Sequence, residues 1–282
     1  MIQDIGPARL DNSYRAADPV PESTVFVFSQ NALLCRYDDA QGTIVLPCRR
    51  DLPGQPELTY LFSIGKQLYF LAQQEITLPG WELRSMQEVR RFHVEDNRIM
   101  FAVFTAFHLW KWYSTNRFCG ACGHPTEHSQ TERALVCQDC GHIVYPRINP
   151  AVIIGVTSGD RLLITRYRRG YAHNALVAGF TEIGETAEQT VSREVMEEAG
   201  IRVKNIRYYK SQPWGVASDL LMGFFCEADG DDTIRMDENE LRYAAWLRPE
   251  EIELQPNQYS LTNEMMRVFK EGRLEAFYLN RE

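Results

Sequence analysis

Apolar residues in the first hundred positions occur in short runs separated by polar turns, a pattern typical of β-strands. Val25 to Phe28 is one such run. Residues 59–64 and 67–72 form a better matched pair, joined at Gly65-Lys66, and they are the strongest candidate for a hairpin. We therefore predict that the chain begins with a β-rich domain.

Longer apolar patterns follow. The stretch 97–114 has helical length and contains neither Gly nor Pro, so it predicts a helix that closes the first domain. After residue 146 the pattern alternates between strand and helix. It predicts a hairpin around Ser158-Gly159-Asp160, strands near 202–210 and 220–227, and helices over 187–199 and 261–270. This order is typical of an α/β domain.

The length and composition are those of a folded protein that can bury more than one hydrophobic core. The chain has 282 residues, of which 44% are hydrophobic and 24% are charged. The patterns divide it into a β-rich domain at 1–115, a cysteine-rich module at 116–146 and an α/β domain at 147–282. No apolar run reaches the roughly 18 to 20 residues of a membrane span, so we expect a soluble, cytoplasmic protein without a membrane partner.

The net charge of −8 argues against broad attraction to nucleic acid, because such binding depends on Lys and Arg that neutralise phosphates. An acidic protein that acts on a phosphate anion must overcome that repulsion locally. Bound divalent cations, together with a few arginines, would do so.

Four of the seven cysteines form two C-x-x-C pairs, Cys119 with Cys122 and Cys137 with Cys140. Each pair continues as Gly-His. Two residues between ligands allow one tight turn to aim both sulfurs at a single ion, and four thiolates suit tetrahedral Zn²⁺. An odd cysteine count without an export signal also favours a reducing compartment, in which paired cysteines are more often metal ligands than disulfides.

Two alternatives to the four-cysteine zinc site are less favoured. One is a redox dithiol or a pair of disulfides, although two equally spaced pairs fit one closed metal site better. The other is a site in which His124 or His142 replaces one thiolate. Four sulfur ligands leave no open position for substrate water, so we expect the zinc to be structural.

The most informative segment is the helix predicted over 187–199, which Thr186 and Gln189 can cap and Gly200 can end. Its carboxylates Glu194, Glu197 and Glu198 occupy positions i, i+3 and i+4, so they lie on one face. Without a counter-ion, each such pair costs roughly 0.2 to 0.5 kcal/mol. Mg²⁺ or Mn²⁺, which prefers oxygen ligands, would make the cluster favourable.

An ordinary solvated acidic helix face is the alternative, and the spacing argues against it. Residues 179–201 match every fixed position of the pattern G-x5-E-x7-R-E-U-x-E-E-x-G-U, in which U is a bulky aliphatic residue. This pattern is that of the Nudix box. The chain is thus similar to the Nudix hydrolases, a family that splits nucleoside diphosphates linked to another group.

The Nudix resemblance implies a fold and a catalytic centre. The fold is an α/β/α sandwich around a mixed sheet, here preceded by the zinc ribbon and the β-rich domain. The resemblance implies that Glu194, Glu197 and Glu198 are the Mg²⁺ or Mn²⁺ ligands. Arg193, four residues before Glu197, can hold the carboxylates in position and balance their charge. A further carboxylate comes from a later loop, for which Glu240 is the candidate and Glu238 the alternative.

The sequence Ser211-Gln-Pro-Trp214, together with the ribbon and the box, resembles the NADH pyrophosphatases over nearly the whole chain. That subfamily splits NAD(H) into AMP and nicotinamide mononucleotide, forms homodimers and can remove NAD caps from RNA. Its marker continues as P-F-P-x-S, whereas this chain reads Gly-Val-Ala-Ser-Asp at 215–219. The departure removes two stiff prolines and an aromatic ring, so the reaction type is better supported than the substrate.

The same resemblance implies substrate contacts from Tyr145, Phe180, Gln212 and Trp214. The three aromatic residues are candidates for stacking on a base, and the second subunit of a dimer can supply one of them. Simple core packing explains each aromatic about as well.

Three functions remain open from the sequence. The first is an NAD(H) diphosphatase with structural zinc. The second keeps the chemistry but acts on ADP-ribose, a dinucleoside polyphosphate, a nucleotide sugar or a capped RNA end. The third is a non-catalytic nucleotide sensor whose ribbon binds nucleic acid, and the complete set of carboxylates argues against it.

Overall fold

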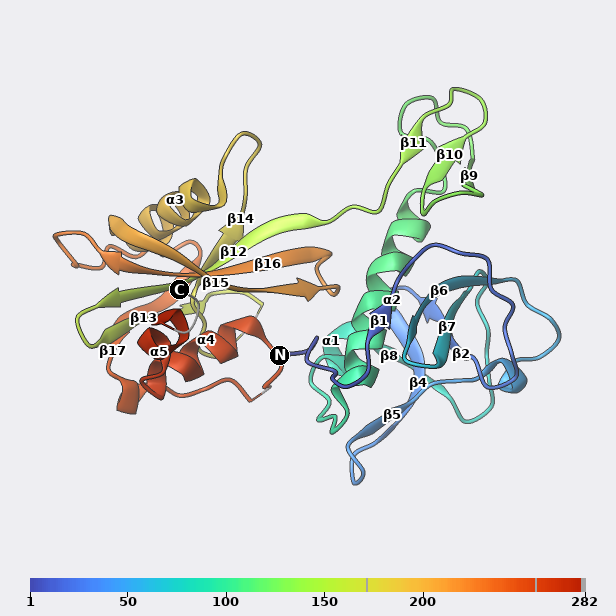
Figure 1. Cartoon of the computed structure of the whole chain (residues 1–282), viewed down its shortest axis with the longest axis horizontal. Helices are drawn as coiled ribbons and strands as arrows, with labels where there is room; N and C mark the ends of the chain where they lie inside the picture. The colour runs from blue at the N-terminus through green and yellow to red at the C-terminus, as the bar shows by residue number, and fades with distance from the viewer. Residues whose placement is uncertain (171, 257, 280–282) are drawn as a thin grey trace. The chain divides into compact units, whose positions relative to one another are not determined.

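The computed structural model describes residues 1–170, 172–256 and 258–279. The chain forms two compact units, each with its own arrangement of strands and helices (Figure 1). The amino-terminal unit comprises residues 2–148 and also Trp214–Ser218. The carboxy-terminal unit comprises Met1, Asn149–Pro213 and the chain from Asp219 onwards.

Two small sheets begin the amino-terminal unit. The first has the strand order β1-β6-β7-β2, and the second has the order β3-β4-β5 with β8 pairing β4. The predicted hairpin is confirmed, because the strands at 58–64 and 67–72 pair antiparallel. The strands are β1 (Leu10–Asp11), β2 (Thr24–Phe26), β3 (Phe28–Ser29), β4 (Ala32–Asp38), β5 (Thr43–Val45), β6 (Leu58–Ile64), β7 (Gln67–Ala72) and β8 (Glu82–Ser85).

Helices complete this part of the amino-terminal unit. A short 3-10 helix, η1 (Arg49–Asp51), and the short α1 (Met86–Val89) precede the long α2 (Asn97–Thr115). The helix predicted from the apolar stretch is thereby confirmed, and Asp96 caps it by accepting a hydrogen bond from the Arg98 amide at 2.9 Å. Its buried side chains include Phe101, Phe104 and Phe107, so α2 supplies much of the core of this unit.

The cysteine-rich module follows α2 as a three-stranded antiparallel sheet in the order β11-β10-β9. Its strands are β9 (Thr126–His128), β10 (Leu135–Cys137) and β11 (Ile143–Val144). Strands this short bury little apolar surface, so the module depends on other contacts to hold its turns together.

A mixed sheet forms the centre of the carboxy-terminal unit. Its order is β15-β16-β12-β13-β17, and β14 pairs β12 beside this path. Strand β12 runs parallel to β16 and antiparallel to β13 and β14. The strands are β12 (Asn149–Ser158), β13 (Arg161–Tyr167), β14 (Val177–Phe180), β15 (Val203–Trp214), β16 (Asp219–Ala228) and β17 (Leu241–Leu247).

Helices cover both faces of this sheet, as Figure 1 shows. Helix α3 (Ala187–Ala199) packs on one face. Helices α4 (Leu261–Lys270) and α5 (Leu274–Leu279) pack on the other face. A 3-10 helix, η2 (Pro249–Glu251), precedes α4 in the sequence. Side chains of β16 alternate between the two cores, with Phe224 facing α3 and Phe225 facing α4. The predicted α/β/α sandwich is confirmed.

Among the described residues, no helix combines the length and the hydrophobicity that a membrane span requires.

Candidate active site and zinc ribbon

Helix α3 has the bounds that its sequence predicted. The Thr186 hydroxyl accepts a hydrogen bond from the Gln189 amide, and the Gln189 side chain accepts one from the Thr186 amide, so both members of a capping box are present. At the other end Gly200 has φ of +69°, a left-handed conformation that ends the helix at little cost. The helix therefore begins and ends where it must to present its acidic face.

Arg193 joins the acidic side chains of this segment. Its Nη1 donates to Glu194 at 2.8 Å and to Glu197 at 2.9 Å. Its Nε donates to Glu185 at 2.6 Å, and this contact lowers the pKa of the Glu185 carboxyl to about 2. Its Nη2 also donates to the carbonyl oxygen of Phe180. One guanidinium thus fixes three carboxylates and the end of β14.

The carboxylates differ in exposure. Glu197 is exposed, whereas Glu194 and Glu198 have relative exposures of 9% and 2%. Burial raises the pKa of both buried groups, and that of Glu198 rises to about 8. Glu194 is paired with Arg193, whereas no cationic side chain is paired with Glu198 among the described residues. A buried carboxyl is costly without such a partner, so the position of Glu198 is explained better by a bound cation than by packing.

Gly179 explains how Glu194 reaches this position. A Cβ built on Gly179 would lie 1.9 Å from the Glu194 carboxyl carbon, so any side chain there would displace the carboxylate. The first glycine of the box therefore makes room for one of its glutamates.

Tyr167 was not identified from the sequence. It ends β13 opposite a bulge in β17, and its hydroxyl lies 3.2 Å from Glu198 Oε1. The other carboxylate oxygen of Glu198 is buried and has no hydrogen-bond partner among the described residues. A buried, unpaired carboxylate oxygen beside further carboxylates is the donor that a hard divalent cation requires.

The later loop brings Glu240 to the same place. The Asp237 amide donates to the Glu198 carbonyl oxygen at 3.0 Å, which ties this loop to the end of α3. The charge of Glu240 raises the pKa of both Glu194 and Glu198. Both Glu238 and Glu240 are exposed, but the charge of Glu240 alone of the two acts on Glu194 and Glu198, which favours Glu240 as the additional acidic residue.

In the described part of the chain, groups of three or more potential ligands within 4.8 Å of one another occur only in the ribbon. The box carboxylates are therefore less tightly gathered than the cysteines. Mutual repulsion and the contacts with Arg193 explain this spacing. Mg²⁺ retains several waters in most protein sites, so its ligands need not form a closed cage.

The four predicted cysteines lie together in the ribbon. Their sulfurs are 3.4 to 3.6 Å apart in the closest pairs, far beyond the length of a disulfide. Tetrahedral zinc with Zn–S bonds of about 2.3 Å places sulfurs about 3.8 Å apart, close to this spacing. The cysteines thus fit one zinc ion, and the disulfide alternative is wrong.

Backbone geometry in each knuckle explains the paired C-x-x-C-G sequence. Gly123 and Gly141 have φ of +80° and +73°, and their amides donate to the carbonyl oxygens of Cys119 and Cys137. The amide of Ala121 points at the Cys119 sulfur and lowers its pKa to about 6, which favours the thiolate. The side chain of His124, which was an alternative zinc ligand, has its Nδ1 3.3 Å from a carboxylate oxygen of Asp139.

The predicted substrate contacts are divided between the two units. Phe180 lies in the carboxy-terminal unit directly after Gly179 and is 55% exposed, so its ring is available. Tyr145 and Trp214 belong to the amino-terminal unit. The Tyr145 hydroxyl donates to Glu132, while Trp214 packs edge-on against Phe104 with 5.3 Å between ring centroids.

Gln212 requires a correction. It has no exposed surface, its amide nitrogen donates to the Tyr259 carbonyl, and its amide oxygen accepts from the Leu261 amide. The side chain therefore holds the start of α4 and is too buried to contact substrate directly. Its place in the SQPW sequence gave no sign of this burial.

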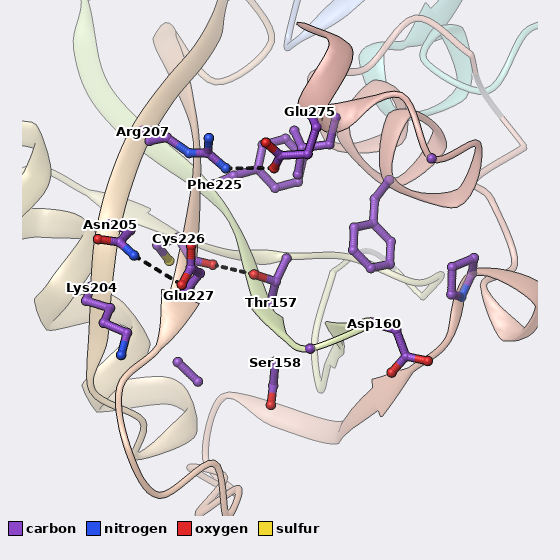
Figure 2. Close-up of a pocket in the computed structure, with 16 residues that line it drawn as sticks. Thr157, Ser158, Asp160, Lys204, Asn205, Arg207, Phe225, Cys226, Glu227 and Glu275 are labelled. Carbon is purple, nitrogen blue, oxygen red and sulfur yellow. Dashed lines mark hydrogen bonds and ion pairs between the residues drawn. The ribbon is translucent and has the colours of Figure 1, made fainter. Parts of the chain in front are cut away.

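A separate cavity of about 570 Å³ lies in the carboxy-terminal unit, near the β12–β13 turn (Figure 2). It contains none of the box carboxylates. Its charged side chains are already paired, Arg207 with Glu275 and Lys204 with Asp229, and Asn205 donates to Glu227. The carboxylates on α3 thus remain the better candidate for catalysis.

Comparisons with known proteins agree with this geometry. Residues 147–269 match the NUDIX domain, and residues 114–145 match the NADH pyrophosphatase zinc ribbon domain. The NAD-capped RNA hydrolase NudC of Citrobacter koseri is 40% identical over 216 residues, covering 74% of this chain and 82% of its own. The protein of the same name from Salmonella schwarzengrund is 40% identical over 209 residues, covering 73% and 77%.

The chain belongs to the NADH pyrophosphatase family of Nudix hydrolases. Among solved structures, a Nudix hydrolase from Nitrosomonas europaea matches 55% of this chain and 91% of its own, with 23% identity and a TM-score of 0.49. As a member of this family, the chain is a diphosphatase. The ribbon and the box are therefore family elements, and Tyr167 is a contact that this structure adds.

Proposed function

We propose that this Nudix hydrolase splits the diphosphate of NAD(H) into AMP and nicotinamide mononucleotide, and that it removes the NAD cap from RNA. The observation that carries the catalytic part is the buried Glu198, whose Oε2 has no hydrogen-bond partner among the described residues and which lies in the field of Glu194 and Glu240. The substrate is supported by relatives that are 40% identical and are named NAD-capped RNA hydrolases.

Glu194, Glu197, Glu198 and Glu240 would hold Mg²⁺ or Mn²⁺. When bound, these ions would lower the pKa of a coordinated water and neutralise charge on the diphosphate oxygens. Water adds to one phosphorus, the bridging P–O bond breaks, and the leaving phosphate takes the electron pair of that bond. Glu197, which is exposed, would accept the proton from water.

Arg193 has a positioning role in this proposal. Its guanidinium bonds to Glu185, Glu194 and Glu197, so it keeps the ligand carboxylates in one arrangement and reduces their repulsion. Because Arg193 also bonds to the Phe180 carbonyl, it links the metal ligands to the neighbouring exposed ring. Phe180 would then stack on a base of the substrate, with Tyr145 and Trp214 as further candidates.

Hydrolysis of a substrate panel tests the function. Purified protein would be incubated with NADH, NAD⁺, ADP-ribose, diadenosine polyphosphates and NAD-capped RNA, each with Mg²⁺ and with Mn²⁺. We expect cleavage of NAD(H) and of the NAD cap. Rapid cleavage of another diphosphate with none of NADH or NAD⁺ would overturn the substrate and leave the Nudix chemistry in place.

Glu197→Gln provides the matched variant, since it removes a negative ligand but keeps the shape of the side chain. We expect turnover to fall about 10²- to 10³-fold with an unchanged melting temperature. Glu188→Gln, an exposed glutamate at the start of the same helix, is the control that should retain activity. Normal turnover of Glu197→Gln would remove this residue from the catalytic centre.

We also propose two properties of the assembled protein. By family resemblance the enzyme is a homodimer, which light scattering of purified protein would test. None of the cysteines forms a disulfide in the structure, which supports a reducing compartment such as the cytoplasm.

A further inference from the structure

The amino-terminal unit contains a cleft of about 590 Å³ lined by residues of its sheets, of α2 and of the ribbon. This volume lies within the range of about 300 to 1,000 Å³ that is usual for small-molecule sites. None of the box residues contributes to it. The cleft is therefore a candidate site separate from the catalytic carboxylates.

Aromatic rings form a large part of its lining. Phe28 and Trp110 pack with their centroids 5.3 Å apart, and Tyr113 is stacked on His128 with 4.8 Å between centroids. Phe118 differs from these rings because it is 64% exposed. A core residue would be covered, so Phe118 offers an open face at which a flat ring could stack.

Arg117 adds an available cation beside that ring. Its side chain is exposed, and its guanidinium has no hydrogen bond or ion pair with the residues that the structure describes. The exposed Gln74 amide is likewise without a partner there. The one carboxylate lining the cleft, that of Glu75, already accepts a hydrogen bond from the Ser29 hydroxyl.

An open aromatic face, an unpaired arginine and an unpaired amide are the groups that bind single-stranded nucleic acid. Bases stack on aromatic rings, phosphates pair with arginine, and amides bond to exposed base edges. An apolar peptide would use the rings but would leave Arg117 without a counter-charge. Because the net charge of the chain is −8, a local cation such as Arg117 would reduce the repulsion that a phosphate ligand meets.

We propose that this cleft binds a nucleotide of single-stranded RNA, with a base stacked on Phe118 and a phosphate paired with Arg117. The cleft would hold part of the RNA chain that carries the NAD cap, so this proposal rests on the proposed function. Hydrolysis of free NAD(H) would not depend on the cleft, because the cleft contains no residue assigned to the catalytic centre.

The test compares free NAD with a short single-stranded RNA bearing an NAD cap, using the full chain and Phe118→Ala or Arg117→Gln variants. We expect Phe118→Ala to lower kcat/KM for the capped RNA about 5- to 100-fold while changing that for NAD less than about 2-fold. Ile143→Ala, which removes another exposed apolar residue from the ribbon, and Arg91→Gln are matched controls that should behave as wild type.

Direct binding separates this proposal from the cap-removing activity. Fluorescence anisotropy of an uncapped single-stranded RNA should show weaker binding by both cleft variants. Arg117→Gln should also reduce the slope of log affinity against log salt by about 0.7, the value for one phosphate contact on a single strand. Zinc content and melting temperature confirm that each variant is folded, and Phe118→Trp should retain binding.

The possible results are distinct. If the wild-type chain binds RNA through Phe118 but does not cleave the cap, the cleft stands and the proposed substrate falls. Cleavage of capped RNA that is unchanged in both cleft variants would overturn the cleft alone. A folded Phe118→Ala variant that loses NAD and capped RNA activity equally would also overturn it, as would an absence of RNA binding by the wild type.

Discussion

Tyr167 of β13 and Glu198 of α3 are in contact, with the phenolic oxygen lying 3.2 Å from a carboxylate oxygen. The Tyr167 hydroxyl lies farther, at 3.4 Å, from the carbonyl oxygens of Leu176 and Ala178. Glu198 is thus the nearest acceptor for the single phenolic hydrogen. The bond leaves the other carboxylate oxygen free to face a cation.

Tyr167→Phe should therefore weaken metal binding without unfolding the protein. Loss of a hydrogen bond that orients a metal ligand typically costs about 10-fold or more in affinity. We expect the Mg²⁺ concentration for half-maximal activity to rise by that factor, with a smaller change in turnover at saturating Mg²⁺. Tyr208→Phe, an exposed tyrosine of β15, is the control. Identical Mg²⁺ dependence in wild type and Tyr167→Phe would show that the contact is not used.

The raised pKa of Glu198 predicts that the free energy of unfolding depends on pH. Burial raises its pKa from 4.5 to about 8 in the folded protein, so between these values the folded state retains a proton that the unfolded state has lost. The metal-free protein should lose stability as pH rises from about 4.5 to 8, since the unfolded state binds fewer protons. Added Mg²⁺ or Mn²⁺ binds the ionised form, so its stabilising effect should increase over the same interval.

Thermal unfolding at pH 6 and pH 8.5, with and without metal, measures this effect. In Glu198→Gln the metal-free melting temperature should depend less on pH, and added metal should raise it less than in wild type. A pH dependence equal to that of wild type would mean that another group is responsible.

Cys137→Ser should abolish zinc binding by the ribbon. Cys137 is fully buried among the four sulfurs, and a hydroxyl is a poor replacement for a thiolate. Elemental analysis should show about one zinc per wild-type chain and about none in the variant, with a lower melting temperature. Cys48→Ser, outside the ribbon, should retain its zinc. Freshly purified, reduced wild-type protein without zinc would contradict the site.

Gly215→Ala should destabilise the amino-terminal unit. An added Cβ would lie 2.0 Å from the Phe104 carbonyl oxygen, which belongs to the backbone of α2 and cannot move aside freely. Overpacking of this kind costs about 1 to 3 kcal/mol, measurable by denaturant unfolding. Gly120→Ala has no atom within 4 Å of its new Cβ and is the control. Equal stability of the two variants would show that Gly215 has room for a side chain.

Phe180→Ala should raise the KM for NADH more than it lowers turnover. Stacking on a base is present in both ground and transition states, and its loss corresponds to about a 5- to 100-fold change. Steady-state kinetics measures the two constants separately, and Phe180→Trp should restore the lower KM. An unchanged KM in Phe180→Ala would leave the ring without a role in binding.

The carboxylate helix could be predicted from the sequence because its determinants are local. The cap at Thr186, the stop at Gly200 and the spacing of Glu194, Glu197 and Glu198 all lie within one continuous segment. The same holds for the ribbon cysteines, whose spacing within each knuckle dictates how the sulfurs converge. Local hydrogen bonding and helical periodicity are sufficient to place such groups relative to one another.

Contacts between distant segments were decided by tertiary structure alone. Tyr167 reaches Glu198 only because β13 pairs with β17 and α3 packs on the sheet, and its neighbours in sequence carried no sign of this contact. The sequence left Glu240 and Glu238 as alternatives, and the charge environment of Glu198 in the folded chain favours Glu240. Gln212, similarly, matched a substrate-binding motif but is buried against the turn before α4. A side chain's exposure and charge environment depend on what folds against it, whereas residue spacing fixes only the geometry within its own element.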